Sequence, residues 1–360
     1  MLRKLIAIVL LSMMITTGAL ANGRPNSDGT ALVHVQGEQL PVVTVTISAA
    51  GDCTLGGDVP GGSYSRFARY YDENGAAYFL ANVRDIFAGD DLTIVNLEGT
   101  FTESDNRQDK TFAFKGKAEY ASILTCGSVE AVSIDNNHTQ DYGAQSTTDT
   151  MQVLDDYGIG YAGLGEFWGT EINGVRIGFL SYRSWNMSRS GMEADVRKLR
   201  TVCDMVIVAI HWGVEKEGMA NNSQINLGHA AIDAGADLVL GHHPHVVQGI
   251  EVYKGRYICY SLGNFCFGGN KNPADKDTFI FRGTYSFTGG NLVASDIAII
   301  PCSVSSVGNT NNYQPTPLTM ENGGRRVFEK LQARSARFGD TIDWNAAVKK
   351  YMEELPASEE

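Results

Sequence analysis

The chain has 360 residues, of which 43% are apolar, enough to form a hydrophobic core and to exclude wholesale disorder. Its 41 acidic and 29 basic residues give a formal net charge of −12 at pH 7, which favours solubility. Since no basic arm or stripe is present, nucleic acid is excluded as the expected partner.

The N-terminus predicts a signal peptide over residues 1–21. Basic residues precede a short apolar run at 5–17, and an Ala-Leu-Ala cleavage pattern ends at Ala21. The run is shorter than the ~20 residues that a spanning helix needs, which disfavours the alternative of an uncleaved anchor. No cysteine follows the run, so a lipoprotein anchor is not expected. We expect a secreted or extracytoplasmic protein with a flexible leader at 22–40.

The apolar runs after the leader alternate with helical patterns. The expected strands cover residues 42–52, 91–99, 129–138, 204–213 and 236–245. The expected helices cover residues 65–87, 118–126, 144–157, 190–200 and 222–234. This alternation predicts an α/β fold, and the near-continuous apolar strands predict sheets covered on both faces.

Two hairpins are expected in the second half of the chain. Asn173-Gly174 is a strong two-residue turn signal, and Lys254-Gly255 is a weaker one. One more strand follows Asn291.

The expected domain covers residues 41–305. A polar linker and a charged C-terminal helix follow at 306–360, with the helical pattern over 325–354. The sequence contains six cysteines. An even number permits disulfides in an exported protein, but most of the six lie in apolar runs, which favours buried free thiols and leaves any pairing open: Cys53, Cys126, Cys203, Cys259, Cys266 and Cys302.

Each of the five expected strands ends in residues that can bind a metal or move a proton. Ligands of open α/β sheets gather at the carboxyl ends of strands, so we expect these side chains to converge. They are Asp52; Asn96 and Glu98; Asn136, Asn137 and His138; His211; and His242, His243 and His245. Carboxylate, amide oxygen and imidazole together favour Mn, Fe or Zn over Mg or Ca. The mixture predicts a site for one or two divalent metal ions.

Each of these residues alone has a simpler interpretation. His211 could be a satisfied buried histidine, Asp52 could cap a turn, and the three later histidines could lie in a surface loop. Their joint occurrence at five strand ends favours the metal site. Gly241 is expected to let the backbone bend before the histidines. Trp212 either lines the site or belongs to the core.

Five motifs occur in one order over roughly residues 42–268: NLEG, NNH, HWG, GHHPHV and SLGNF. With them the chain resembles the CapA-type poly-γ-glutamate capsule biosynthesis proteins of the calcineurin-like metallophosphoesterase superfamily. The resemblance implies a four-layer αββα sandwich of metallophosphoesterase type with the site at one edge.

The resemblance also implies residue roles. The implied metal ligands are Asp52, Glu98, Asn137, His211, His243 and His245, with His242 as an alternative to His243. Asn137 and His138 form the implied catalytic pair, in which the imidazole acts as general acid or orients a phosphate. The candidate substrate-binding residues are Asn96, Lys110 and Asn264.

Lys110 lies in a basic segment that could hold an anionic substrate. Its basic neighbours are Arg107, Lys115 and Lys117. An ordinary solvated basic loop is the alternative.

Two departures from the superfamily pattern bear on catalysis. The first superfamily motif is Asp-x-His, whereas Cys53 and Thr54 follow Asp52 here, so one imidazole is missing. Glu98 stands where the superfamily has a bridging aspartate, which alters the metal spacing. These departures leave open one metal, a different metal, or no catalysis.

The expected function is metal-dependent hydrolysis in poly-γ-glutamate biosynthesis or processing. The bond would be a phosphoester or a γ-glutamyl amide, with His138 assisting the leaving group. The first alternative is a non-catalytic accessory protein that binds the polymer or a membrane-bound capsule synthase. The second is a secreted metallophosphatase acting on phosphoesters.

Overall fold

The computed structural model describes residues 40–339 and 342–354, the side chains of 352–354 excepted. The predicted signal peptide and nearly all of the predicted leader lie outside the described residues. Within the described part of the chain, no helix has the length and apolar character needed to cross a bilayer.

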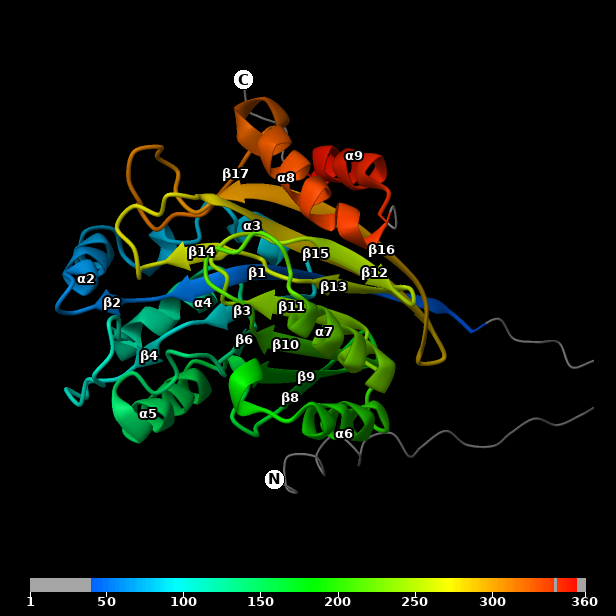
Figure 1. Ribbon diagram of the computed structural model, residues 1–360, viewed down its shortest axis with the longest axis horizontal. Helices are drawn as coiled ribbons and strands as arrows, with labels where there is room; N and C mark the ends of the chain where they lie inside the picture. The colour runs from blue at the N-terminus through cyan, green and yellow to red at the C-terminus, as the bar shows by residue number, and fades with distance from the viewer. Residues whose placement is uncertain (1–39, 340–341, 355–360) are drawn as a thin grey trace, which may run out of the picture. The chain divides into compact units, whose positions relative to one another are not determined.

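The first sheet has eight strands, which come from both the N-terminal and the C-terminal parts of the described chain (Figure 1). β1, β3, β6 and β7 are parallel to one another, β15 is antiparallel to its neighbour β1, and β16 is antiparallel to β15. β14 (Asn264–Phe267) pairs in parallel with the end of β1. The order is β17 (Thr316–Pro317), β16 (Asn291–Ser303), β15 (Asp277–Thr288), β1 (Val42–Thr54), β3 (Leu92–Leu97), β6 (Ala131–Ser133) and β7 (Gly160–Ala162).

The second sheet has six strands, and the four at its centre are parallel. Its order is β12 (Ile250–Tyr253), β13 (Arg256–Cys259), β11 (Leu238–His242), β10 (Met205–His211), β9 (Val175–Arg183) and β8 (Trp168–Ile172). A small third sheet contains β2 (Gly57–Asp58), β5 (Phe114–Gly116) and β4 (Thr100–Phe101).

Both predicted hairpins are confirmed. β8 and β9 meet at Asn173-Gly174, with φ of 53° and 79°, and β12 and β13 meet at Lys254-Gly255, with φ of 51° and 76°. Two successive residues with positive φ are typical of the turn whose twist matches an antiparallel strand pair.

The helices match the predicted ones with two exceptions: the segments predicted over 65–87 and 325–354 are each divided into two α-helices. They are α2 (Ser63–Asn74), α3 (Arg84–Ala88), α4 (Ser122–Cys126), α5 (Gly143–Asp156), α6 (Arg189–Arg200), α7 (Asn222–Ala234), α8 (Arg325–Ser335) and α9 (Trp344–Glu354). Short 3₁₀ turns are η1 (Ala76–Tyr78), η2 (Ala118–Ala121), η3 (Ser184–Asn186) and η5 (Ala336–Phe338), and η4 (Met320–Gly324) is a π turn. The single helix predicted over 65–87 is wrong. Gly75, with φ of 76°, ends α2, and α3 starts nine residues later.

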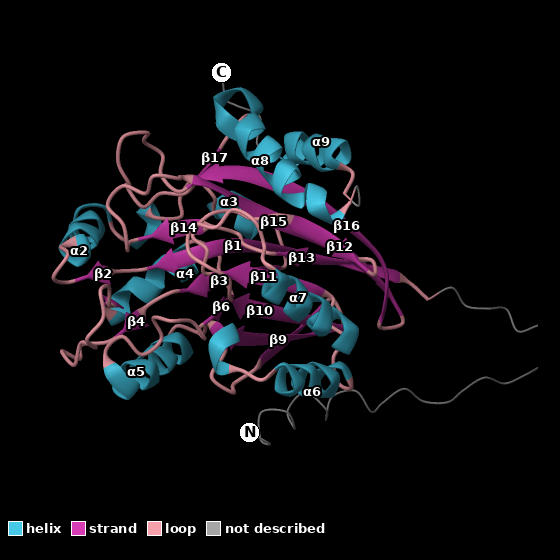
Figure 2. Cartoon of the chain, in the orientation of Figure 1, coloured by secondary structure: helices cyan, strands magenta, loops and turns pink. Residues whose placement is uncertain are grey.

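β10 shows how the layers are built. Its residues alternate between two apolar clusters, one shared with the first sheet and one shared with α6 and α7: Met205, Ile207 and Ala209 in the former, and Val206, Val208 and Ile210 in the latter. The two sheets therefore pack face to face, and helices cover the outer faces (Figure 2). The predicted α/β sandwich and its C-terminal helical extension are confirmed.

The C-terminal helices pack on the sandwich. α9 and α8 contact β16, and α8 also contacts β12 and β15. The guanidinium of Arg334 donates to the carbonyl of Val247, and the hydroxyl of Ser335 accepts from the backbone N–H of Ile250 at 2.9 Å. A Cβ on Gly249 would lie 2.4 Å from the carbonyl oxygen of Arg334. α8 is thus pressed directly against the segment that follows the histidine cluster.

The six cysteines form no disulfide in the described part of the chain. Cys53, Cys259, Cys266 and Cys302 are buried, and the other two are half-buried. Burial raises the pKa of Cys53 to about 12, so its thiol stays protonated although it follows Asp52.

Candidate functional site

Strands from both sheets bring the predicted residues to one edge of the sandwich. In the first sheet, Asp52 on β1 is in register with Asn96 on β3. In the second, His211 at the end of β10 is in register with His242 at the end of β11. Parallel strands align their carboxyl ends, which is why residues distant in sequence converge here.

Glu98 lies at the centre of this edge. Its carboxylate is fully buried, and neither oxygen has a hydrogen-bond partner. Oε1 lies 3.8 Å from Nε2 of His138 and 3.7 Å from Nε2 of both His211 and His245. Burial raises the pKa of Glu98 well above its usual value. An unpartnered carboxylate at this depth is costly unless a cation neutralises it, so the site fits a cation.

Asp52 is also fully buried and contacts two imidazoles. Its Oδ1 accepts from Asn96 at 2.9 Å and lies 3.3 Å from Nδ1 of His242, while Oδ2 lies 3.1 Å from Nδ1 of His245. Burial works to raise the pKa of Asp52, but the two imidazoles outweigh it and hold the pKa well below normal. For His245, burial acts to lower the pKa, yet the charge of Glu98 and the contact with Asp52 raise it to about 10. The carboxylates therefore favour positive charge between them.

Three groups of side chains have ligand atoms that all lie within 4.8 Å of one another, the spacing needed to hold a metal ion. They are Glu98 with His211 and His243; Asp52 with Glu98 and His245; and Glu215 with His243 and His245. Glu98 belongs to two groups, so two adjacent metal positions would share its carboxylate. The mixed carboxylate and imidazole donors fit the predicted Mn, Fe or Zn.

The histidine turn has an unusual backbone. His243 and His245 have φ of 99° and 59°, in the left-handed region that non-glycine residues rarely adopt. His243 belongs to two metal-binding groups, whereas His242 points toward Asp52 and belongs to none. Both ring nitrogens of His242 are buried without a hydrogen-bond partner, so His242 stays an alternative to His243 as the ligand.

Gly241 has a different role from the predicted bend. It lies inside β11, and a Cβ there would be 2.1 Å from the carbonyl oxygen of Tyr260. Gly241 is needed because the chain from Cys259 to Tyr260 passes too close for any side chain. The sharp turn begins at His243.

The Asn137-His138 pair faces the same cluster. Oδ1 of Asn137 lies 2.7 Å from Nε2 of His211. Nδ1 of His138 lies 2.6 Å from Oδ2 of Asp141, and since a carboxylate only accepts, Nδ1 carries the proton. Burial lowers the pKa of His138 despite Asp141, which leaves Nε2 unprotonated and directed toward Glu98.

Asp141 is held by two further groups. Lys110 donates to its Oδ1 at 2.7 Å, and the backbone N–H of Phe114 donates to its Oδ2 at 2.5 Å. The ring of Phe114 stacks on His138 with centroids 4.3 Å apart. Asp141 and its neighbours therefore fix the orientation of the His138 ring.

The candidate substrate-binding residues are engaged with site residues. Asn96 is buried and bonds Asp52 through its amide N–H and Ser133 through its amide oxygen. Asn264 bonds His245 at both the ring, 2.9 Å, and the carbonyl, 3.2 Å. Lys110 contacts Asp141. These contacts hold other site residues in place. A direct role of Asn96, Lys110 and Asn264 in substrate binding stays a prediction.

The basic segment around Lys110 is neutralised residue by residue. Each cation pairs with a carboxylate: Arg107 with Asp58 at 3.0 Å, Lys110 with Asp141 at 2.7 Å, Lys115 with Asp105 at 3.1 Å and Lys117 with Glu119 at 3.2 Å. Little positive charge is therefore left over for an anionic substrate.

Three residues near the cluster were not predicted: Asp141, Glu215 and Trp185. Trp185 is 52% exposed, and its ring lies 5.1 Å from His243 and 5.9 Å from His211. Trp185 thus lines the site, whereas Trp212 is a core residue whose indole N–H donates to the carbonyl of Tyr260. The only sequence signal was proximity, since Asp141 follows His138 by three residues and Glu215 follows His211 by four.

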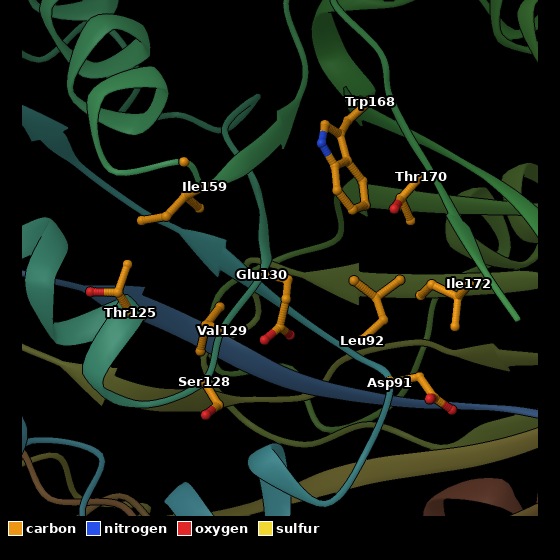
Figure 3. Close-up of a pocket in the computed structure, with 11 residues that line it drawn as sticks. Asp91, Leu92, Thr125, Ser128, Val129, Glu130, Ile159, Trp168, Thr170 and Ile172 are labelled. Atoms are coloured by element: carbon orange, nitrogen blue, oxygen red, sulfur yellow. The ribbon is translucent and has the colours of Figure 1, made fainter. Parts of the chain in front are cut away.

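A separate cavity of about 410 Å³ lies at the opposite ends of the parallel strands (Figure 3). Asp91 and Glu130, just before β3 and β6, line it together with Trp168 on β8. The carboxylate of Glu130 accepts from the backbone N–H of Thr93 at 2.8 Å, and burial raises its pKa to about 7. None of the predicted metal ligands lines this cavity.

The two sheets of the α/β sandwich thus gather carboxylates and imidazoles at one edge, where their parallel strands end. A family model described as "Bacterial capsule synthesis protein PGA_cap" matches residues 46–269. The chain belongs to this PGA_cap family, as its motifs predicted.

Named relatives agree with this family. The chain is 32% identical over 238 residues to the PGA biosynthesis protein CapA of Bacillus subtilis (strain 168), covering 59% of this chain and 62% of that relative. It is 29% identical over 308 residues to the capsule biosynthesis protein CapA of Bacillus anthracis, covering 77% and 72%. It is 23% identical over 291 residues to the Probable polyglutamine synthesis accessory protein of Mycobacterium tuberculosis (strain CDC 1551 / Oshkosh), covering 70% and 76%.

Proposed function

We propose that this protein is an exported, metal-dependent hydrolase that acts on an anionic polymer of the poly-γ-glutamate type during capsule biosynthesis or processing. The observation that carries the proposal is Glu98, a fully buried carboxylate without a hydrogen-bond partner, surrounded by three imidazoles. The names of the relatives support the polymer, and the N-terminal residues 1–21 support export. The bond cleaved would be a γ-glutamyl amide or a phosphoester.

Six residues carry donor atoms that could bind the metal. Those that would hold one or two divalent cations are Asp52, Glu98, Asn137, His211, His243 and His245. When bound, a divalent cation supplies Lewis acidity, which acidifies water and stabilises negative charge on a reacting oxygen.

His138 would provide the proton transfer. Its protonated Nδ1 is fixed by Asp141, so the lone pair of Nε2 faces the cluster. Nε2 can accept a proton from water and return it to a leaving amine or alkoxide. Lys110 donates to Asp141 at 2.7 Å, and Asp141 favours positive charge on His138 when a proton arrives.

The test is turnover with defined substrates. Protein lacking residues 1–21 would be loaded with Mn²⁺ and assayed on poly-γ-glutamate, a generic phosphodiester and a phosphomonoester. Metal-stimulated cleavage of the polymer that His138→Ala abolishes supports the proposal. Cleavage of phosphomonoesters alone, with the polymer untouched, would instead support a secreted metallophosphatase.

One observation favours a non-catalytic accessory protein as the second candidate. Thr54 stands where the superfamily has a metal-binding histidine. Its hydroxyl donates to the carbonyl of Glu98 at 2.8 Å and supplies no ligand to the metal site. A relative is also named an accessory protein. Polymer binding, or binding to a membrane-bound capsule synthase, without turnover of any substrate would support this candidate.

A further inference from the structure

The two metal positions are unequally supplied with ligands. The position at Glu98, His211 and His243 can add the amide oxygen of Asn137, which already lies 2.7 Å from the His211 ring. The group of Asp52, Glu98 and His245 has three donors, one short of the four that zinc takes, and His242, whose Nδ1 lies 3.3 Å from Oδ1 of Asp52, stands outside this group. Because Thr54 is turned away, the segment after Asp52 does not fill the gap.

Glu215 lies where the missing donor is needed. It stands in the loop after β10, and its carboxylate forms a group with His243 and His245. His243 also belongs to the position of Glu98 and His211, and His245 to the position of Asp52 and Glu98, so Glu215 lies beside both positions; only the second of them is short of a donor.

Two hydrogen bonds made by the residues just after Glu215 hold its loop against the histidine turn. The backbone N–H of Lys216 donates to the carbonyl of Pro244 at 2.8 Å, between the two histidines. The side chain of Gln248 donates to the carbonyl of Glu217 at 2.7 Å. Lys216 has φ of 66°, a left-handed conformation that brings its N–H onto Pro244.

We propose that Glu215 is a metal ligand that completes the Asp52 position and replaces the imidazole missing after Asp52; this inference rests on the metal site of the proposed function. The position then has three carboxylates, from Asp52, Glu98 and Glu215, and one imidazole. Such an oxygen-rich set favours Mn²⁺, whereas the position of His211 and His243 is richer in nitrogen and suits Zn²⁺ or Fe. The two positions therefore differ in metal preference.

The experiment compares Mn²⁺ binding by the wild-type chain and by Glu215→Gln, which keeps the shape and removes the charge. Glu217→Gln is the matched control, because Glu217 is equally exposed in the same loop but belongs to no metal-binding group. Metal-free protein would be titrated by calorimetry, and the bound ions examined by electron paramagnetic resonance for coupling between two Mn²⁺. We expect Glu215→Gln to bind one of the two ions at least ~10-fold more weakly and to lose the coupled spectrum.

The outcomes separate the two proposals. Glu217→Gln should match the wild type, and Glu215→Asp should recover part of the second ion. Equal stoichiometry, affinity and spin coupling in wild type and Glu215→Gln would overturn the role of Glu215 while leaving the proposed function intact. Loss of both ions in Glu215→Gln would overturn its assignment to the Asp52 position. A wild-type chain that binds no Mn²⁺, Zn²⁺ or Fe would overturn the proposed function and this inference together.

Discussion

Replacing Glu98 with glutamine gives the sharpest test of the buried cluster, because it should change stability in opposite directions with and without metal. The substitution conserves shape, so it leaves no cavity. It removes the carboxylate that both candidate metal positions share. It also removes a buried charge whose two oxygens have no hydrogen-bond partner.

The magnitudes follow from these two facts. A ligand at 100 times its dissociation constant stabilises the folded wild type by about 2.7 kcal/mol. At ~2–4 °C per kcal/mol, that is a rise of roughly 5–10 °C in the melting temperature. We expect Glu98→Gln to lose most of this rise. Without metal, the variant should be no less stable than wild type because it removes a buried charge, and any gain should stay below about 1–3 kcal/mol because the new amide is itself buried without a partner.

Thermal unfolding measured by circular dichroism, with chelator and with a Mn²⁺ series, tests both parts. Glu171→Gln is the control, since Glu171 is exposed on β8 and belongs to no metal-binding group. A full metal-induced rise in Glu98→Gln would refute the shared carboxylate. A metal-free variant markedly less stable than wild type would show that Glu98 has a stabilising partner in solution.

Three further results are expected. His138→Gln should lower kcat by about 10²–10⁴-fold with Mn²⁺ affinity unchanged, and steady-state kinetics with calorimetry will detect any parallel loss of metal. Gly241→Ala should lower the free energy of unfolding by about 3 kcal/mol or more, because its Cβ would lie 2.1 Å from the carbonyl oxygen of Tyr260; wild-type stability in urea would contradict the close contact. The carboxyl of Glu130 has a pKa of about 7 in the folded protein, above its ordinary value of 4.5. Protonated Glu130 therefore stabilises the fold at low pH, and this contribution is lost as the pH rises through 7. Glu130→Gln should flatten that decline between pH 5 and 8, and an unchanged slope of melting temperature against pH would count against it.

The predictable part of the site is the part that parallel strands determine. A strand buried on both faces, such as β10, is recognisable as an unbroken apolar run, and its carboxyl end fixes where the next side chain points. Asp52 and His211 could therefore be placed at one edge from sequence alone. α7 matches its predicted bounds because Asn221 and Gln224 form a capping box at its start.

The parts that could not be predicted depend on contacts between segments distant in sequence. The place of Glu215 is set by the bond from Lys216 to Pro244, and the basic segment is neutralised by partners such as Asp58, which lies 49 residues from Arg107. No local pattern reports either contact. β15 was also missing from the predicted strands, because Arg282 and Gly283 interrupt its apolar pattern and its pairing with β1 is long-range.

The contact between α8 and the segment after the histidines has a consequence for how the chain can be shortened. The family match ends at residue 269 and includes all the predicted ligands, yet Arg334 and Ser335 anchor Val247 and Ile250 from well beyond that boundary. A truncated protein ending there would contain every donor atom. It would lose the contacts with α8 that hold the turn of His243 and His245 in its left-handed conformation. The minimal metal-binding fragment should therefore extend through α8.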